Sequence, residues 1–295
     1  MGAIASITFL VAGITQGGPH FTAMPETLLV EQGTFGAFQG AARIDSDLRG
    51  RFFVVDRTSS TITVFSPRHE RLEVLGGFGW SGTGFDHPSA VATDGISTYV
   101  ADYGNHRIVR LDQSLNPVSF LATRDTSFAP ARFGYPQGLA LSRQGDLFVL
   151  DGENVRVLKF DRRSVFERSF GGVESGSGRL RAPVEVLVTV RDRVWVLEED
   201  RIVEFDFAGN YVGTIGKGIL SSSRGFGETE NGVVVATADR LWFFDWQGMP
   251  ASSIEISNII ASAPVDVMDV AVSNDVLHVL TPHTVIVFAV EQAAH

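Results

Sequence analysis

The stretch HPSAVATDGISTYVADYGNHRIVRLDQSLNPVSFLA, residues 87–122, contains four short apolar segments separated by turn-forming residues. The first follows Pro88, the second ends at Asp102, the third begins at Arg107 and the fourth begins at Pro117. Short segments in which apolar and polar residues alternate are typical of half-buried β-strands. The Gly, Asn and Asp residues between them favour tight turns. This stretch therefore predicts four antiparallel strands in succession.

The same order of segments recurs along the chain. Six β-rich segments end in a small or acidic residue: FFVVD (52–56), TYVAD (98–102), LFVLD (147–151), VWVLE (194–198), VVVAT (233–237) and LHVLT (277–281). Their last residues are 46, 49, 47, 39 and 44 positions apart. Periods of about 40–50 residues with several strands per unit are characteristic of propeller blades. We therefore predict an all-β fold, a six-bladed β-propeller with four antiparallel strands in each blade.

The two ends of the chain are expected to complete one blade together. The sixth repeat ends near Val290 without a fourth strand, and the apolar segment ETLLVEQG (26–33) belongs to no repeat. Because unpaired edge strands promote aggregation, closing the ring is favourable. We predict that residues 26–33 pair with residues 284–290, so that residues 21–295 form a single propeller domain.

Residues 1–20 precede that domain and include an apolar run at 3–14. The run has the length of a signal-peptide core, but the basic residues that normally precede such a core are absent. The segment is therefore either a signal peptide, which places the protein in the periplasm or outside the cell, or an N-terminal extension of a cytoplasmic protein. No other run approaches the roughly 20 apolar residues of a membrane-spanning helix.

Composition excludes several functional classes. The formal net charge is −10, which disfavours nucleic-acid binding because that binding depends on a basic surface. The absence of cysteine removes disulfides, thiolate zinc sites, iron–sulfur clusters and cysteine nucleophiles.

Residues 87–122 resemble an NHL repeat, with a proline before the inner strand, a YVAD strand and an N-x-R-I turn. Residues 135–171 and 182–216 resemble it less closely. The resemblance implies a six-bladed propeller of the bacterial NHL-repeat type, in which the acid and the Asn–Arg pair of the repeat hold turns together within a blade. On that basis we interpret five residues as structural: Asp56, Asp102, Asp151, Arg107 and Arg156. The resemblance also implies a range of activities, because propellers of this kind include protein-binding platforms, RNA readers and a zinc-dependent lyase, and related folds include calcium-dependent lactonases and antibiotic lyases.

A binding face is expected on the loops that lead from one blade into the next, at residues 76–87, 123–135, 172–182 and 216–225. Aromatic and arginine side chains are enriched where proteins bind partners. These loops supply our binding-face candidates: Phe78, Trp80, Phe85, Arg124, Phe133, Tyr135, Arg179 and Arg181. The alternative is that several of the aromatic side chains fill the core between blades.

The central channel supplies three further candidates, His87, Glu185 and Asp266. Glu185 and Asp266 each follow an Ala-Pro pair and are expected at equivalent places in their inner strands. The corresponding residues of two other blades, Ala90 and Gly138, are inert. A zinc or calcium site needs several converging ligands, so we expect no cofactor, with calcium as the alternative. No nucleophile motif is present, and we name no catalytic residue.

Two functional hypotheses follow. The first is a non-catalytic platform at the cell envelope that binds another protein or a ligand, with no nucleic-acid partner. The second is a channel-centred hydrolase or lyase that uses a divalent metal ion. Neither the oligomeric state nor the partner's identity follows from the sequence.

Overall fold

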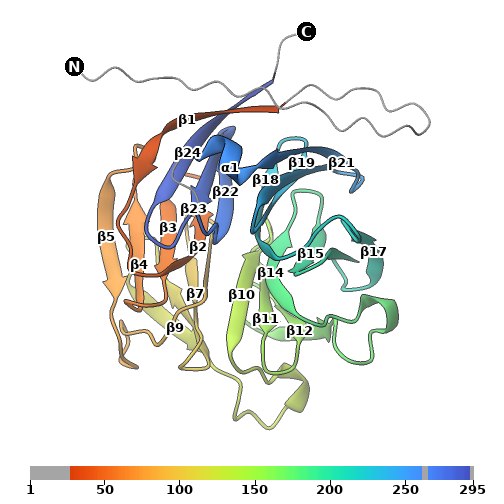
Figure 1. Ribbon diagram of the computed structural model, residues 1–295. Helices are drawn as coiled ribbons and strands as arrows, with labels where there is room; N and C mark the ends of the chain where they lie inside the picture. The colour runs from red at the N-terminus through yellow and green to blue at the C-terminus, as the bar shows by residue number, and fades with distance from the viewer. Residues whose placement is uncertain (1–26, 261–264, 293–295) are drawn as a thin grey trace.

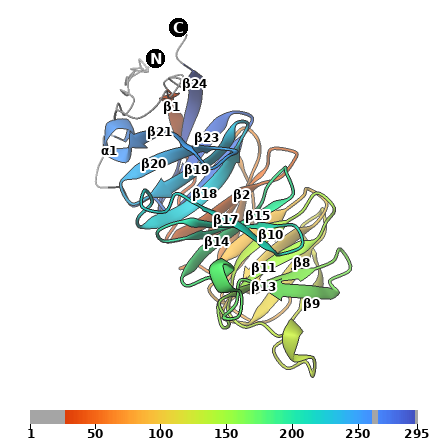
Figure 2. The same cartoon turned by 90° about the vertical axis from the view of Figure 1, so that its right-hand side faces the viewer.

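In the computed structural model, which describes residues 27–260 and 265–292, six four-stranded antiparallel sheets surround a central axis (Figure 1). Figure 2 shows the same sheets from the side. The predicted all-β, six-bladed propeller is confirmed. The helical segments in the described residues are short: η1 (Ala129–Ala131), η2 (Gly176–Gly178) and α1 (Ile256–Ile259). No helix among the described residues is long and apolar enough to cross a membrane.

Each of blades one to five consists of four consecutive strands, ordered from the channel outward. Blade one comprises β2 (Ala41–Ser46), β3 (Phe52–Asp56), β4 (Thr61–Phe65) and β5 (Arg71–Gly76). Blade two comprises β6 (Ala90–Thr93), β7 (Thr98–Asp102), β8 (Arg107–Leu111) and β9 (Pro117–Leu121). Blade three comprises β10 (Pro136–Leu141), β11 (Leu147–Asp151), β12 (Arg156–Phe160) and β13 (Phe166–Phe170). Blade four comprises β14 (Pro183–Val188), β15 (Arg193–Glu198), β16 (Ile202–Asp206) and β17 (Tyr211–Ile215). Blade five comprises β18 (Ser223–Thr229), β19 (Gly232–Thr237), β20 (Arg240–Asp245) and β21 (Pro250–Glu255).

Blade six joins the two ends of the chain. It contains β22 (Asp269–Ser273), β23 (Val276–Leu280) and β24 (Val285–Gln292), and its outer strand is β1 (Thr27–Phe35). β1 runs antiparallel to β24, with an irregularity between Glu31 and Gly33 (Figure 1). The predicted closure of the last blade is therefore confirmed. The predicted signal-peptide core lies outside the described residues.

A histidine pair adds to the junction between blades six and one. Nε2 of His69, in the turn between β4 and β5, lies 3.2 Å from Nε2 of His278 on β23. The ring of Phe35 stacks on His69 with centroids 4.3 Å apart. Burial and the neighbouring His69 lower the pKa of His278 to about 4, and burial also lowers the pKa of His69. Both imidazoles are therefore neutral at pH 7, and the Nε2–H of one donates a hydrogen bond to the Nε2 of the other.

The acids that end the second strands anchor the inter-blade loops, the loops that lead from one blade into the next. In four blades a carboxylate accepts a backbone N–H of the preceding loop: Asp56 from Gln39, Asp102 from Asp86, Asp151 from Gly134 and Glu198 from Ala182. Arg107 and Arg156 donate to Asp102 and Asp151, at 2.7 Å and 3.2 Å, and to carbonyl oxygens of the same loops. These contacts agree with the structural role that the resemblance implied for the five residues.

Four inter-blade loops also place one apolar side chain between neighbouring blades: Phe85, Phe133, Leu180 and Leu220. The loops approach the preceding outer strand closely. A Cβ on Gly171, whose φ is +79°, would lie 2.7 Å from Cδ1 of Leu180, so this position requires glycine. The cores between blades are therefore sealed on the loop side of the ring.

Candidate functional site

A pocket of about 500 Å³ lies in the central channel. It is lined by the inner strands of all six blades: β2, β6, β10, β14, β18 and β22. Turn residues also line it, including Leu48 between β2 and β3, Val190 between β14 and β15, and Trp246 between β20 and β21. The pocket therefore opens on the face that carries these turns, which we call the turn face. The inter-blade loops form the opposite face, the loop face.

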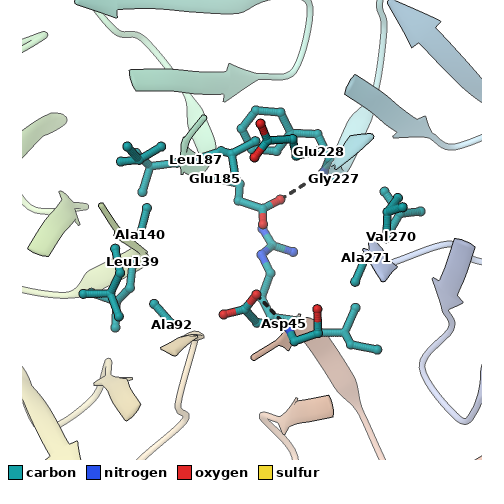
Figure 3. A pocket seen from close by; sticks show the side chains of 18 of the residues that line it. Asp45, Ala92, Leu139, Ala140, Glu185, Leu187, Gly227, Glu228, Val270 and Ala271 are labelled. Atoms are coloured by element: carbon teal, nitrogen blue, oxygen red, sulfur yellow. Dashed lines mark hydrogen bonds between the residues drawn. The ribbon is translucent and has the colours of Figure 1, made fainter. Parts of the chain in front are cut away.

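Small residues make the pocket possible where the blades converge. Ala92, Ala140, Gly227 and Ala271 line its walls at equivalent positions of four inner strands, opposite the second-strand residues of their own blades (Figure 3). Leu187 occupies the equivalent position of β14. These residues leave a wide, mostly apolar space, as is usual for a small-molecule site.

In β2 the position equivalent to Leu187 is occupied by a charged residue, Asp45. Figure 3 shows it reaching into the pocket from the wall opposite Glu185. Its carboxylate accepts the backbone N–H groups of Ser46 (2.8 Å) and Thr93 (3.1 Å). Burial, which outweighs these hydrogen bonds, raises the pKa of Asp45 to about 7, and the negative charge of Asp269 adds to the rise. Asp45 can therefore exchange a proton near neutral pH.

Glu185 lies deeper in the pocket, with Asp269 behind it. Glu185 accepts the N–H of Phe226 (3.2 Å), while Asp269 is fully buried and accepts the N–H groups of Ile44 (2.9 Å) and Val270 (2.8 Å). Burial raises the pKa of Glu185 well above its ordinary value and that of Asp269 to about 6. Repulsion from Asp269 and Asp45 adds to the rise of the Glu185 pKa, whereas the positive charge of Arg43 lowers the pKa of both Glu185 and Asp269. At neutral pH this pair shares at least one proton.

Arg43 supplies the positive charge at the closed end of the pocket. Its guanidinium donates to the carbonyl oxygens of Ala42 (2.9 Å) and Val184 (2.8 Å), while its buried Nε has no partner in the described structure. The carbonyl contacts hold the guanidinium in place across two blades.

Of the three channel candidates, only Glu185 lines this pocket. His87 is exposed in an inter-blade loop, beside the carboxylate of Asp86. Asp266 is exposed and precedes β22, so its expected equivalence with Glu185 is wrong. The residue of blade six that is equivalent to Glu185 is Asp269, which pairs with Leu280 just as Glu185 pairs with Leu197. The reason is that the alanine of the Ala-Pro pair lies six residues before Asp269 in blade six but three residues before Glu185 in blade four.

Spacing within the repeat could have identified Asp269 and Arg43. Glu185 lies 13 residues before Glu198, the last residue of the second strand, and Asp269 lies 12 residues before Thr281. The same interval of 13 residues leads from Asp56 back to Arg43. The second strand is thus a better reference point than the proline before the first.

The binding-face candidates divide into exposed and buried residues. Phe78 and Trp80 are 80% and 84% exposed on the loop face, whereas Phe85 and Phe133 are 1% and 0% exposed. The alternative that some of these aromatic side chains fill the core is therefore correct for Phe85 and Phe133. Both pack between blades because the loop folds back over the gap.

The remaining binding-face candidates lie on the loop face without forming a pocket with the acids. Tyr135 is partly exposed, and the guanidinium of Arg124 lies 5.7 Å from its ring centroid. Arg124 also pairs with Glu153 at 3.3 Å. Arg179 and Arg181 are exposed in the loop before β14. The loop face thus offers a scattered surface, and the turn face offers a cavity.

Across residues 27–260 and 265–292, no group of three or more His, Cys, Asp or Glu side chains is arranged to hold a metal ion. The carboxylates of the pocket are instead satisfied by backbone amides.

Comparison with known proteins confirms the family resemblance at the level of the repeat. The NHL repeat model matches residues 133–160, which run from the loop before blade three to the end of β12. Together with the six-bladed propeller, this match supports an NHL-repeat propeller. No curated protein sequence matches the chain.

Solved structures share the fold at low sequence identity. A streptogramin B lyase is 10% identical with a TM-score of 0.63, and the alignment covers 90% of this chain and 98% of that one. Virginiamycin B lyase from Staphylococcus aureus is 11% identical with a TM-score of 0.57, covering 86% and 82%. Hydrazine synthase of Kuenenia stuttgartiensis is 15% identical with a TM-score of 0.59, covering 90% and 77%. Similarity at this level shows the fold alone.

Proposed function

We propose that this propeller is a non-catalytic binding protein that takes a small ligand into the channel pocket from the turn face. The observation that carries the proposal is the pocket itself, a cavity of about 500 Å³ lined by all six inner strands. Ligand sites of about 300–1,000 Å³ with apolar walls and a few polar groups are common in proteins. The small inner-strand residues keep this space open. Arg43 and Glu185 lie toward its closed end, and Glu228 and Glu230 lie nearer the turn face.

Native mass spectrometry after incubation with a small-molecule cell extract tests this proposal. We expect the wild-type protein to retain at least one compound through dialysis. Leu187 points into the pocket (Figure 3), so Leu187→Trp fills the cavity and should abolish retention. Val212→Trp, on the partly exposed outer strand β17, is the matched control and should retain the compound. Equal retention by both variants, or none by the wild type, would refute the proposal.

The same experiment addresses a lyase or hydrolase as the second candidate. Two observations favour it: perturbed carboxylate pKa values in a pocket are typical of acid–base catalysts, and two lyases share the fold. A binding protein releases the retained compound unchanged, whereas an enzyme releases it with an altered mass. If the released compound has an altered mass, and Asp45→Asn suppresses this change, the protein is an enzyme and not a binding protein.

A protein partner remains part of the proposal through the loop face. Phe78 and Trp80 are large, exposed apolar side chains two positions apart in one loop. If a partner docks there, Phe78→Ala combined with Trp80→Ala should abolish its co-purification from native cells without lowering stability. Undiminished recovery of the partner would exclude this loop.

A further inference from the structure

Four of the five buried acids that the described structure places outside the pocket are paired with arginine, and the fifth, Asp56, accepts backbone N–H groups such as those of Gln39 and Ser59. Four such pairs recur around the ring: Asp47 with Arg51 at 2.8 Å, Asp102 with Arg107 at 2.7 Å, Asp151 with Arg156 at 3.2 Å and Glu198 with Arg201 at 2.6 Å. A buried carboxylate needs such compensation because removing a charge from water is unfavourable. Arginine is thus the usual partner of a buried acid that supports the fold.

The acids of the pocket depart from that rule. Asp45, Glu185 and Glu228 line the pocket, and Asp269 lies behind it. In the described part of the chain, none of these four carboxylates has an arginine or lysine nitrogen within the 4.0 Å of an ion pair. Their hydrogen bonds come from backbone amides, which leave further acceptor positions free.

Arg43 does not provide the missing charge by direct contact. Both of its terminal nitrogens donate to backbone carbonyl oxygens, those of Ala42 and Val184. Of the charged side chains that line the pocket, Arg43 is basic, whereas Asp45, Glu185, Glu228 and Glu230 are acidic. The pocket therefore has more acidic than basic side chains.

We infer that the ligand of this pocket carries an ammonium group on an apolar body. The ammonium would lie between Asp45 and Glu185, which reach into the cavity from opposite walls (Figure 3). Its N–H donors match carboxylate oxygens, and its charge compensates the acids as arginine does elsewhere in the ring. The apolar body would lie against Leu187 and extend toward Leu48 and Val190 at the mouth. This inference rests on the proposed binding function and names its ligand class.

Binding of a cation should release protons. The charged groups around Asp45 are Arg43 and Asp47 on its own segment, Glu185 on β14, Glu228 on β18, Glu230 in the turn after β18 and Asp269 on β22, while β6 and β10 contribute no titratable side chain to the pocket. Burial and mutual repulsion keep these carboxyl groups partly protonated at neutral pH. An ammonium ion favours the ionised carboxylate, so each carboxyl group that ionises on binding transfers its proton to the buffer. Affinity should therefore rise between about pH 6 and about pH 8.

Isothermal titration calorimetry with three probes of similar shape tests the inference. The probes are 2-phenylethylammonium, 2-phenylethanol and 3-phenylpropanoate, each measured in phosphate and in HEPES, whose heats of ionisation differ. We expect the ammonium to bind at least about tenfold more tightly than the other two, with net proton release. Glu185→Gln and Asp45→Asn should each weaken its binding by about tenfold or more. Glu174→Gln, an exposed acid of the loop before β14, is the control and should bind like the wild type.

The outcomes separate the ligand class from the binding function. Equal or tighter binding of the alcohol or the carboxylate, abolished by Leu187→Trp, would overturn the ammonium inference while the pocket remained a binding site. Proton uptake on ammonium binding would likewise overturn it. Absence of binding by any probe would also count against the ammonium inference, and the retention experiment above would then decide the binding function independently.

Discussion

Replacing Phe133 with alanine is expected to lower the free energy of unfolding by about 3–5 kcal/mol. Phe133 comes from a loop, but its ring is 0% exposed and packs between blades two and three. It contacts the ring of Phe160 edge-on, with centroids 6.2 Å apart. Truncation would remove buried apolar surface and leave a cavity that the two rigid sheets cannot fill. Urea unfolding followed by tryptophan fluorescence measures the change.

Phe78→Ala is the matched control for this prediction. Phe78 lies in the inter-blade loop before blade two, but its ring is 80% exposed, so its truncation should change stability by no more than about 0.5 kcal/mol. Equal effects of the two substitutions would contradict the division of the loop aromatics into core and surface.

Asp102→Ala should also destabilise the fold by about 3–5 kcal/mol. The Asp102 carboxylate is fully buried and accepts the N–H of Asp86 and the Nε of Arg107, both at 2.7 Å. Its removal leaves the largely buried Arg107 without its counter-ion and detaches the loop before blade two. Thermal and urea unfolding should both report the loss.

Glu153→Ala provides the comparison with an exposed ion pair. Glu153 and Arg124 lie 3.3 Å apart, and both side chains are substantially exposed. Screening by water and side-chain entropy reduce such a pair to about 0–1 kcal/mol. A small effect of Asp102→Ala, similar to that of Glu153→Ala, would argue against the structural role of the second-strand acids.

The ring was predictable because its signals are local and repeated. Alternating segments such as those around Asp102 specify strands, and their regular spacing specifies blades. Closure by β1 followed from one unpaired segment at each end of the chain. The strands, the blades and the closure of the ring all depend on backbone pairing between strands, and the pattern of apolar residues along the sequence predicts where those strands lie.

The site was less predictable because it depends on registration between blades. Asp269 was overlooked because the proline before blade six suggested a register three residues out of step. Asp45 and Arg43 come from blade one, whose inner strand lacks the proline that marks the inner strands of blades two, three and four. Which end of the channel is open depends on side-chain volumes in six strands at once, and no single repeat carries that information.

A crystal structure of the protein soaked with 2-phenylethylammonium would test the account most directly, because the central claim is that the turn-face pocket is the ligand site. We predict that the ammonium nitrogen lies within hydrogen-bonding distance of Asp45 or Glu185, with the phenyl ring directed toward Leu48 and Val190. Ligand density on the loop face beside Phe78 and Trp80, with the channel pocket free of ligand, would contradict the account.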